Sequence, residues 1–210
     1  MSTERDRETA ARIDLELMLR VQQDDREAFG ELVRRYQNRI VGLAYRYLGS
    51  AADAEDVAQD VFLRVHRARE SYQPTARFST WIHRITVNAS LNRIRSRKAR
   101  KKIGSEMPMT AEGATAADAV PADELGAHER MERDELAVVL RAIVDRLPER
   151  QRTALLLNKY QDLSYEEVAA SMELTVSAVK SLLTRARNNV RRELVPYLER
   201  GALETPGEEL

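Results

Sequence analysis

The chain has 210 residues and contains no cysteine. Without thiols it can form neither disulfides nor thiolate metal sites. Its three histidines, His66, His83 and His128, are scattered and do not have the spacing of a metal cluster, so each is interpreted as structural or exposed. We therefore expect no metal ion and no cofactor.

Glycine and proline are also sparse, with eight and six residues, and alternating apolar–polar runs are short. Strand signals are correspondingly few. A composition of 43% apolar and 32% charged residues suits a soluble helical protein. The sequence predicts an all-α fold, with a length that allows one large domain or two small ones.

No apolar run approaches the roughly 18 residues that a membrane-spanning helix needs. The N-terminal stretch MSTERDRETAARID is charged, lacks an apolar centre and does not resemble a signal peptide. These absences predict a cytoplasmic protein that does not insert into a membrane. The chain also lacks a nucleophile–base pairing, a phosphate-binding loop and a metal constellation, so we expect no enzyme and no catalytic residue.

The formal net charge is zero, from 34 basic and 34 acidic residues, so any charged binding surface must come from local asymmetry. Residues 54–68 predict an amphipathic helix with an acidic start. Val57, Val61 and Val65 recur at helical spacing and indicate its buried face. Another face carries four polar side chains, those of Asp56, Gln59, Asp60 and Arg64. Periodicity alone leaves open that this face is only solvated.

Pro74 interrupts the helical pattern and predicts a short loop over residues 70–76, before a helix that begins near Ser79. Spacings of four, four and three residues bring Arg84, Asn88, Asn92 and Arg95 to one face of that helix. Asn and Arg can read base edges, and Arg also binds phosphate. A run of basic residues without an acid is typical of a surface for a polyanion. It consists of Arg93, Arg95, Arg97, Lys98, Arg100, Lys101 and Lys102.

Residues 131–196 predict a second helical domain. A stripe from Leu136 to Leu147 indicates its first helix, and Pro148 separates this helix from three more. Ser164 and Glu167 form a capping-box pattern. A turn at residues 173–175 precedes a helix with a polar and basic outer face, which is a helix-turn-helix arrangement. An ordinary amphipathic hairpin with a solvated face remains the alternative.

The segments outside the two domains differ in composition. Residues 104–130 are rich in Ala, Gly, Thr and acidic residues, with few large apolar side chains, and predict a flexible acidic linker. It is either a simple spacer or a segment with a function of its own. The first domain is predicted over residues 14–103, with flexible ends at residues 1–13 and 197–210.

Two blocks resemble a known family. DAEDVAQDVFLRVH followed by FSTWIHRITVNASLNRIR resembles region 2 of a bacterial RNA polymerase sigma factor of the extracytoplasmic-function (ECF) type, in the sigma-70 family. The block LPERQR, LSYEEVA and TVSAVKSLLTRAR resembles sigma region 4, although Glu173 occupies the turn position where Gly is commoner. A region 2, a linker and a region 4 without a region 3 between them is the ECF layout. The resemblance implies a dissociable subunit that directs core polymerase to −10 and −35 promoter elements.

The resemblance also implies which residues bind. The polar face of the first helix would meet the clamp helices of the largest polymerase subunit through Asp56, Gln59, Asp60 and Arg64. The non-template strand of the −10 element would be held by the loop from Tyr72 to Arg77 and by Arg84, Asn88, Asn92 and Arg95. Tyr72, Phe78 and Trp81 are candidates for a base-stacking ring, and Trp81 is favoured as a core anchor instead. The −35 set is Ser177, Lys180, Ser181, Thr184, Arg185 and Arg187.

Two further expectations concern partners. The resemblance implies an anti-sigma factor, often membrane-bound, and a linker that passes near the polymerase active site, where its acidic residues could mimic nucleic acid. The alternative function is a stand-alone helix-turn-helix regulator that binds an operator as a dimer. The acidic–Gln helix and the Trp-bearing basic helix argue against that alternative.

Overall fold

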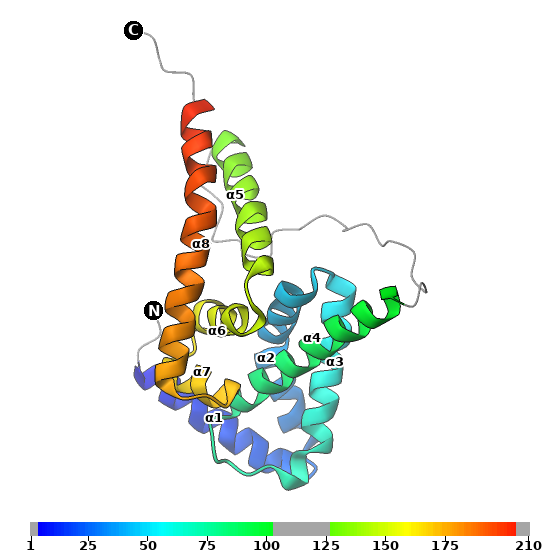
Figure 1. Cartoon of the computed structure of the whole chain (residues 1–210). Coiled ribbons are helices and arrows are strands. Elements are labelled where there is room, and N and C mark those ends of the chain that lie inside the picture. The colour runs from blue at the N-terminus through cyan, green and yellow to red at the C-terminus, as the bar shows by residue number, and fades with distance from the viewer. Residues whose placement is uncertain (1–3, 103–126, 205–210) are drawn as a thin grey trace.

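The computed structural model describes residues 4–102 and 127–204. Within these two ranges the secondary structure consists of α-helices and one 3-10 turn, without strands (Figure 1). The expected all-α class is therefore confirmed. Most of the predicted acidic linker, residues 104–126, lies outside the described residues. The helices form two bundles, one before and one after that segment.

The first bundle is built around a continuous apolar core. Met18, Ile40, Val61 and Ile82 come from its four α-helices, and none of their side chains is exposed to solvent. The periodic apolar positions of the sequence supply this core. Its elements are α1 (Glu4–Gln22), α2 (Arg26–Leu48), α3 (Ala51–Arg67), the 3-10 turn η1 (Arg69–Ser71) and α4 (Phe78–Lys102).

Local capping sets the boundaries of the central helices. Asp25 caps α2, and its carboxylate accepts hydrogen bonds from the backbone N–H groups of Glu27 and Ala28. Gly49 ends α2 in the left-handed conformation at φ 74°, which glycine adopts at little cost. Ser50 then caps α3 through a hydrogen bond from the Asp53 N–H. Local capping residues thus set where α2 begins and where it gives way to α3.

The second bundle carries the predicted helix-turn-helix. Ser164 and Glu167 form the capping box, in which each side chain accepts from the other residue's backbone N–H. Glu173 ends the first helix of the motif in the left-handed region at φ 55°. The helices of this bundle are α5 (Ala127–Arg146), α6 (Glu149–Tyr160), α7 (Tyr165–Met172) and α8 (Val176–Glu204).

Helix ends at the chain termini differ from the prediction. α1 begins at Glu4, inside the stretch predicted to be flexible, and the Arg7 guanidinium donates to the Asp162 carbonyl at 2.9 Å. α8 continues through Pro196 to Glu204, where a flexible tail was expected, and α5 begins at Ala127 rather than near Met131. The Arg7 contact joins residues far apart in the chain, and no local pattern in the sequence shows it.

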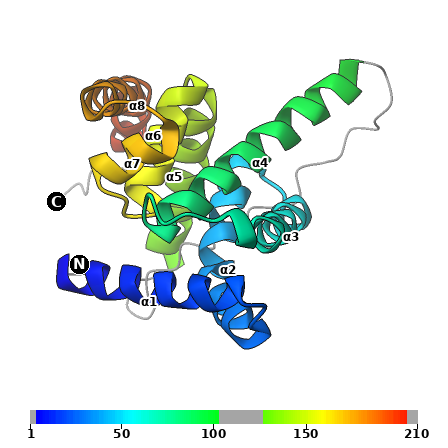
Figure 2. The same ribbon diagram turned by 90° about the horizontal axis from the view of Figure 1, so that it is seen from below.

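The two bundles pack directly against each other. α6 and α7 lie against α2 and the first turns of α4, while the basic end of α4 projects away from the second bundle (Figure 2). Leu43, Tyr47 and Val87 of the first bundle share an apolar core with residues such as Leu157 and Leu183 of the second. The candidate binding faces of α4 and α8 therefore lie on two bundles that are joined by a hydrophobic contact.

Candidate nucleic-acid and protein interfaces

The polar face of α3 is open to solvent. All four residues predicted to contact the polymerase, Asp56, Gln59, Asp60 and Arg64, are exposed. The opposite side of the same helix faces the core, where Val57, Val61 and Val65 are buried. The structure thus places the predicted set together on one exposed face.

An open apolar groove of about 660 Å³ adjoins this face, between α1, α2 and α3. Phe29, Val33, Phe62 and Leu63 line it, and Gln59 of the polar face also contributes to its wall. Leu63 is 52% exposed, which is high for a leucine. The periodicity of a single helix does not reveal the groove, because side chains of α1, α2 and α3 form it together.

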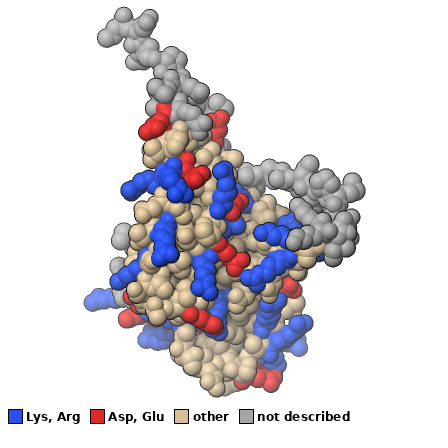
Figure 3. Space-filling view, in the orientation of Figure 1, with Lys and Arg blue, Asp and Glu red and all other residues tan. Residues whose placement is uncertain are grey.

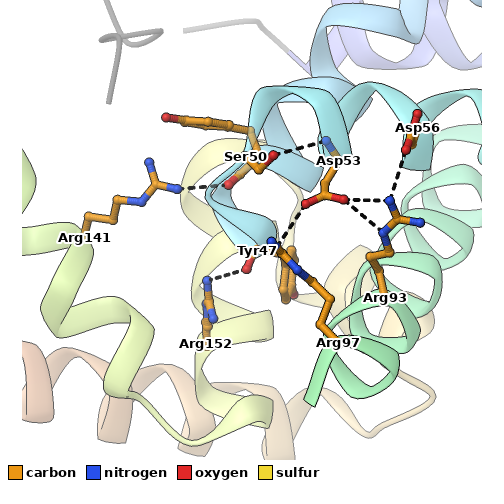
Figure 4. Close-up of polar contacts among 9 residues, drawn as sticks. Tyr47, Ser50, Asp53, Asp56, Arg93, Arg97, Arg141 and Arg152 are labelled. Atoms are coloured by element: carbon orange, nitrogen blue, oxygen red, sulfur yellow. Dashed lines mark hydrogen bonds and ion pairs between the residues drawn. The ribbon is translucent and has the colours of Figure 1, made fainter. Parts of the chain in front are cut away.

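A cluster of charges ties the basic helix α4 to the beginning of α3 (Figure 4). Arg93 donates to Asp53 at 2.6 Å and to Asp56 at 3.0 Å, and Arg97 pairs with Asp53 at 3.0 Å. Partial burial opposes ionisation of Asp53, but the hydrogen bond from Arg93 and the charge of Arg97 outweigh it and lower the pKa of Asp53. Two arginines of the basic run are therefore partly neutralised by acids that lie about forty residues earlier.

The Asn-bearing face of α4 presents a mixture of free and paired side chains. Asn88 and Asn92 are exposed, as amides that bind bases must be. Arg84 instead donates to Glu173 at 3.0 Å, and Arg95 donates to Glu149 at 3.1 Å. Arg84, Asn88, Asn92 and Arg95 thus all lie on α4, as predicted. The two arginines of this set form ion pairs with carboxylates of the second bundle.

The loop before α4 shows the same relationship. Arg77 donates to Glu167 of α7 at 2.9 Å. Tyr72 is only 7% exposed, and its ring centroid lies 5.0 Å from that of Trp81 and 6.3 Å from that of Phe78. These rings pack against the first core, which agrees with the interpretation of Trp81 as a core anchor.

A buried histidine lies where the bundles meet. His83 on α4 is 1% exposed, and its Nε2 lies 3.0 Å from Oε1 of Gln161. Burial lowers the pKa of His83 to about 4, and the positive charge of Arg39 acts in the same direction. The ring is neutral at physiological pH. His66, by contrast, is exposed, and the side chain of His128 lies outside the described residues.

The outer face of α8 is unobstructed. Val179, Leu183 and Ala186 point inward and are buried. Basic side chains gather over α8 and over the outer part of α4 on the face drawn in Figure 3, with acidic side chains between them. All members of the predicted −35 set are exposed, namely Ser177, Lys180, Ser181, Thr184, Arg185 and Arg187.

Across residues 4–102 and 127–204, the acidic and histidine side chains form no group of three that could hold a metal ion. In the same part of the chain, no helix combines the length and apolar character needed to cross a membrane.

Comparison with known proteins matches both halves of the chain. A model of sigma-70 region 2 matches residues 32–100, and a model of sigma-70 region 4 matches residues 137–190. The RNA polymerase sigma-H factor of Pseudomonas aeruginosa is 36% identical over 187 residues, which cover 88% of this chain and 95% of that protein. The ECF RNA polymerase sigma-E factor of Escherichia coli K12 is 34% identical over 188 residues, covering 89% and 97%.

A solved structure supports the fold. The structure of CnrH in complex with the cytosolic domain of CnrY has a TM-score of 0.65 at 23% identity, and the match covers 88% of this chain and 98% of that one. This chain belongs to the sigma-70 family and, within it, to the ECF sigma factors. Sigma factors are initiation factors rather than enzymes, as the sequence predicted, and the stand-alone regulator is not favoured.

Proposed function

We propose that three surfaces of this ECF sigma factor divide its tasks. The outer face of α3 binds core RNA polymerase, the Asn-bearing face of α4 with the loop from Tyr72 to Arg77 holds the −10 element, and the exposed face of α8 reads the −35 element. The observation that carries the proposal is that each set is local: the α3 and α8 sets each lie on one helix, and the −10 set lies on α4 and the loop directly before it. All three sets fall within the segments matched by the region 2 and region 4 models.

The proposed polymerase surface has the chemistry of a protein interface. Asp56 and Asp60 offer carboxylates, and Gln59 offers an amide, to basic partner residues through charge-assisted hydrogen bonds. The groove lined by Phe62 and Leu63 adds an apolar surface beside them. The polar side chains would orient a bound partner, and the apolar groove would bury part of its surface.

The proposed −10 surface suits a separated strand. Capture of unstacked bases needs groups that bind base edges and positive charge along the backbone. Asn88 and Asn92 supply the amides, while Arg84 and Arg95 supply charge within the same turns of α4. The basic run continues beyond Arg95 with Arg97, Lys98 and Arg100.

The proposed −35 surface suits an intact duplex. The second helix of a helix-turn-helix enters the major groove, where Lys and Arg bind guanine or phosphate. Lys180, Thr184 and Arg185 recur at helical spacing on the exposed side of α8. The buried residues of α8 hold that helix on α6 and α7.

The proposed partners include an inhibitor. One solved structure of similar fold, with a TM-score of 0.58 at 20% identity, is that of the sigma factor RpoE in complex with the anti-sigma factor NepR from Bartonella quintana. By analogy, we propose that an anti-sigma factor controls this protein as well. We place the protein in the cytoplasm, where it would meet core polymerase and promoter DNA.

Run-off transcription with purified core polymerase tests the function. Genomic fragments are transcribed with core alone and with core plus this protein, and the start sites are mapped. We expect new start sites that share upstream sequences near −10 and −35. If the protein is retained on operator-like DNA but is not pulled down with core polymerase and yields no new start site, the proposal is wrong.

A further inference from the structure

The loop from Tyr72 to Arg77, here named the −10 loop, has an exposed middle between two buried rings. Residues 73–76 are all exposed, whereas Tyr72 and Phe78 on either side are buried. Four residues span at most about 14 Å of extended chain. The position of the exposed middle is therefore set by how the two ends of the loop are held.

The end of the loop that leads into α4 is held by the helix itself. The Trp81 N–H donates to the Arg77 carbonyl at 3.2 Å, and the Phe78 ring centroid lies 5.2 Å from that of Tyr36 in the core. The other end follows η1, which has only three residues. A 3-10 turn of that length has poor hydrogen-bond geometry and holds little by itself. Contacts from elsewhere in the chain must fix this end.

Gln22 at the end of α1 supplies the first of these contacts. Its Nε2 donates to the Arg69 carbonyl at 3.1 Å and to the Tyr72 carbonyl at 3.0 Å. A side-chain amide carries two N–H groups, so one half-buried glutamine satisfies both acceptors. Arg69 begins η1 and Tyr72 follows its last residue. Gln22 therefore fixes both ends of η1, and with them the point at which the −10 loop begins.

Asp24 supplies the second contact. Its Oδ1 accepts from Nε of Arg69 at 2.9 Å and from Nη2 at 2.7 Å. Nη1 of the same guanidinium donates to the His66 carbonyl at 3.0 Å. The Arg69 side chain is only 18% exposed, so its guanidinium is held between α3, η1 and the turn after α1. This arginine joins the start of the −10 loop to the α1–α2 turn.

The backbone of Asp24 is strained. Its φ is 61°, in the left-handed region where glycine is unstrained and a side chain adds cost. The Asp24 N–H donates to the Val21 carbonyl and the Asp25 N–H to the Arg20 carbonyl, which is the Schellman pattern that most often has glycine at this position. The Asp24 side chain is 72% exposed, so its ion pair contributes little to stability. A strained residue with little effect on stability points to a role in function.

We propose that Gln22 and the Asp24–Arg69 ion pair are positioning residues for promoter recognition, which hold the −10 loop in the place where it selects bases. They act through the loop backbone rather than by contact with DNA. The proposal rests on the proposed function of the loop. Loss of either contact lets the exposed residues 73–76 shift, so that correct and incorrect bases are bound more equally.

The test measures base selection by holoenzyme assembled from core polymerase and the full-length chain. The template is a promoter mapped by run-off transcription, together with variants of it that each carry one substituted −10 base pair. The selection ratio is the initiation rate on the mapped promoter divided by the rate on a substituted one. Both rates come from the same holoenzyme, so changes in core affinity or in the folded fraction cancel.

Gln22→Met removes the amide donor and keeps a side chain of similar length. We expect the selection ratio to fall at least fivefold at one or two neighbouring −10 bases, because the exposed part of the loop is short. Ratios at the other −10 positions are expected to stay within twofold of the parent. Gln23→Met, the same replacement at the exposed next residue, is the matched control and is expected to keep every ratio within twofold. An equal fall in the control would overturn the role of Gln22.

Two substitutions of Asp24 separate positioning from stability. Asp24→Gly relaxes the backbone and removes the carboxylate, so we expect a urea midpoint at or above that of the parent and a selection ratio at least threefold lower at the same bases. Asp24→Asn tolerates the left-handed conformation and keeps an oxygen for Arg69, and its ratios are expected to stay within twofold. A purely structural role predicts no loss of selection from a variant that is as stable as the parent.

Asp162→Gly is the matched control for the relaxed backbone. Asp162 is an exposed aspartate with φ 52° in the second bundle, and its replacement is expected to leave −10 selection within twofold of the parent. Parental ratios for Asp24→Gly would overturn the role of the ion pair, and parental ratios for Gln22→Met would overturn that of the amide.

Replacement of residues 73–76 by glycine separates this proposal from the proposed function. If the glycine loop loses selection while Gln22→Met and Asp24→Gly both keep it, the loop selects bases and the positioning proposal alone is wrong. If the glycine loop keeps the parental ratios, the loop does not select bases. Its assignment to the −10 element is then wrong, and the positioning proposal fails with it.

Discussion

Nε2 of His83 lies 3.0 Å from Oε1 of Gln161, and this contact joins α4 of the first bundle to the residue that ends α6 in the second. His83 is almost completely buried, with Arg39 and Glu167 as the charged groups that act on it from α2 and α7. A neutral imidazole is therefore part of the contact between the bundles. Protonation of that imidazole is disfavoured for as long as the bundles stay closed.

The first prediction is a loss of stability in mild acid. The pKa of His83 is about 4 in the folded protein, below its ordinary value of 6.5, so the unfolded chain binds the proton more readily. The free energy of unfolding is unaffected above pH 7 and falls as the pH decreases from about 6.5 to 4, by roughly 3 kcal/mol in total. Urea denaturation at a series of pH values measures this change.

The variant His83→Gln isolates the contribution of the histidine. Other carboxylates titrate in the same range, so the informative quantity is the difference between parent and variant at each pH. We expect the variant to be less stable than the parent at pH 7 and to show a shallower decline towards pH 4. Parallel curves for the two proteins would mean that His83 does not titrate as proposed.

The second prediction concerns core binding. Joint replacement of Asp56 and Asp60 by Arg is expected to weaken association with core polymerase by about 2–5 kcal/mol, because both charges would be desolvated at the interface. Asp56 is 62% exposed, so loss of its pair with Arg93 costs the fold little. Titration of labelled protein into core polymerase measures the affinity.

A control for that experiment replaces Glu55 and Glu70 by Arg. Both residues are exposed on the same bundle and lie outside the proposed interface. The control is expected to bind core nearly as the parent does. Near-parental affinity of the Asp56 and Asp60 variant would refute the assignment of the α3 face.

The third prediction concerns the −35 element. Lys180→Ala or Arg185→Ala is expected to cost about 1–3 kcal/mol of promoter binding where the residue contacts a base edge. A phosphate contact would instead give a smaller loss with a shallower salt dependence. Arg192→Ala, at an exposed position further along α8, is the control. Footprints over the −35 region that match the parent for both variants would disprove the recognition-helix assignment.

The fourth prediction concerns promoter melting. Asn88 and Asn92 are exposed amides on α4, so Asn88→Ala with Asn92→Ala is expected to abolish promoter opening and to leave core binding intact. Permanganate reactivity of −10 thymines is the measurement. A premelted bubble template is expected to restore only part of the activity, because base selection is lost together with opening.

The control for melting is Ser96→Ala, an exposed substitution one turn beyond Asn92. It is expected to open duplex promoters as the parent does. If the double Asn variant also does so, this face of α4 does not capture the strand, and the loop from Tyr72 to Arg77 must act alone.

Several features of this protein could be predicted from the sequence alone, because they depend on neighbours in the chain. Asp25, Gly49 and Ser164 act within a few residues of their positions, so the boundaries of α2 and α7 follow from local capping. Apolar periodicity likewise determined which faces of α3 and α8 are buried. The two family motifs could be identified for the same reason, since each is a continuous stretch of sequence.

The tertiary structure alone decided which charges meet. Arg84 and Glu173 are separated by 89 residues, and Arg95 and Glu149 by 54. The sequence shows a basic run without an acid in it, and no pattern along the chain relates its residues to carboxylates so far away. The packing of the second bundle on α4 brings these carboxylates to the arginines. The hydrophobic effect favours that packing, because Leu43, Tyr47 and Val87 of the first bundle are buried in an apolar core that they share with the second.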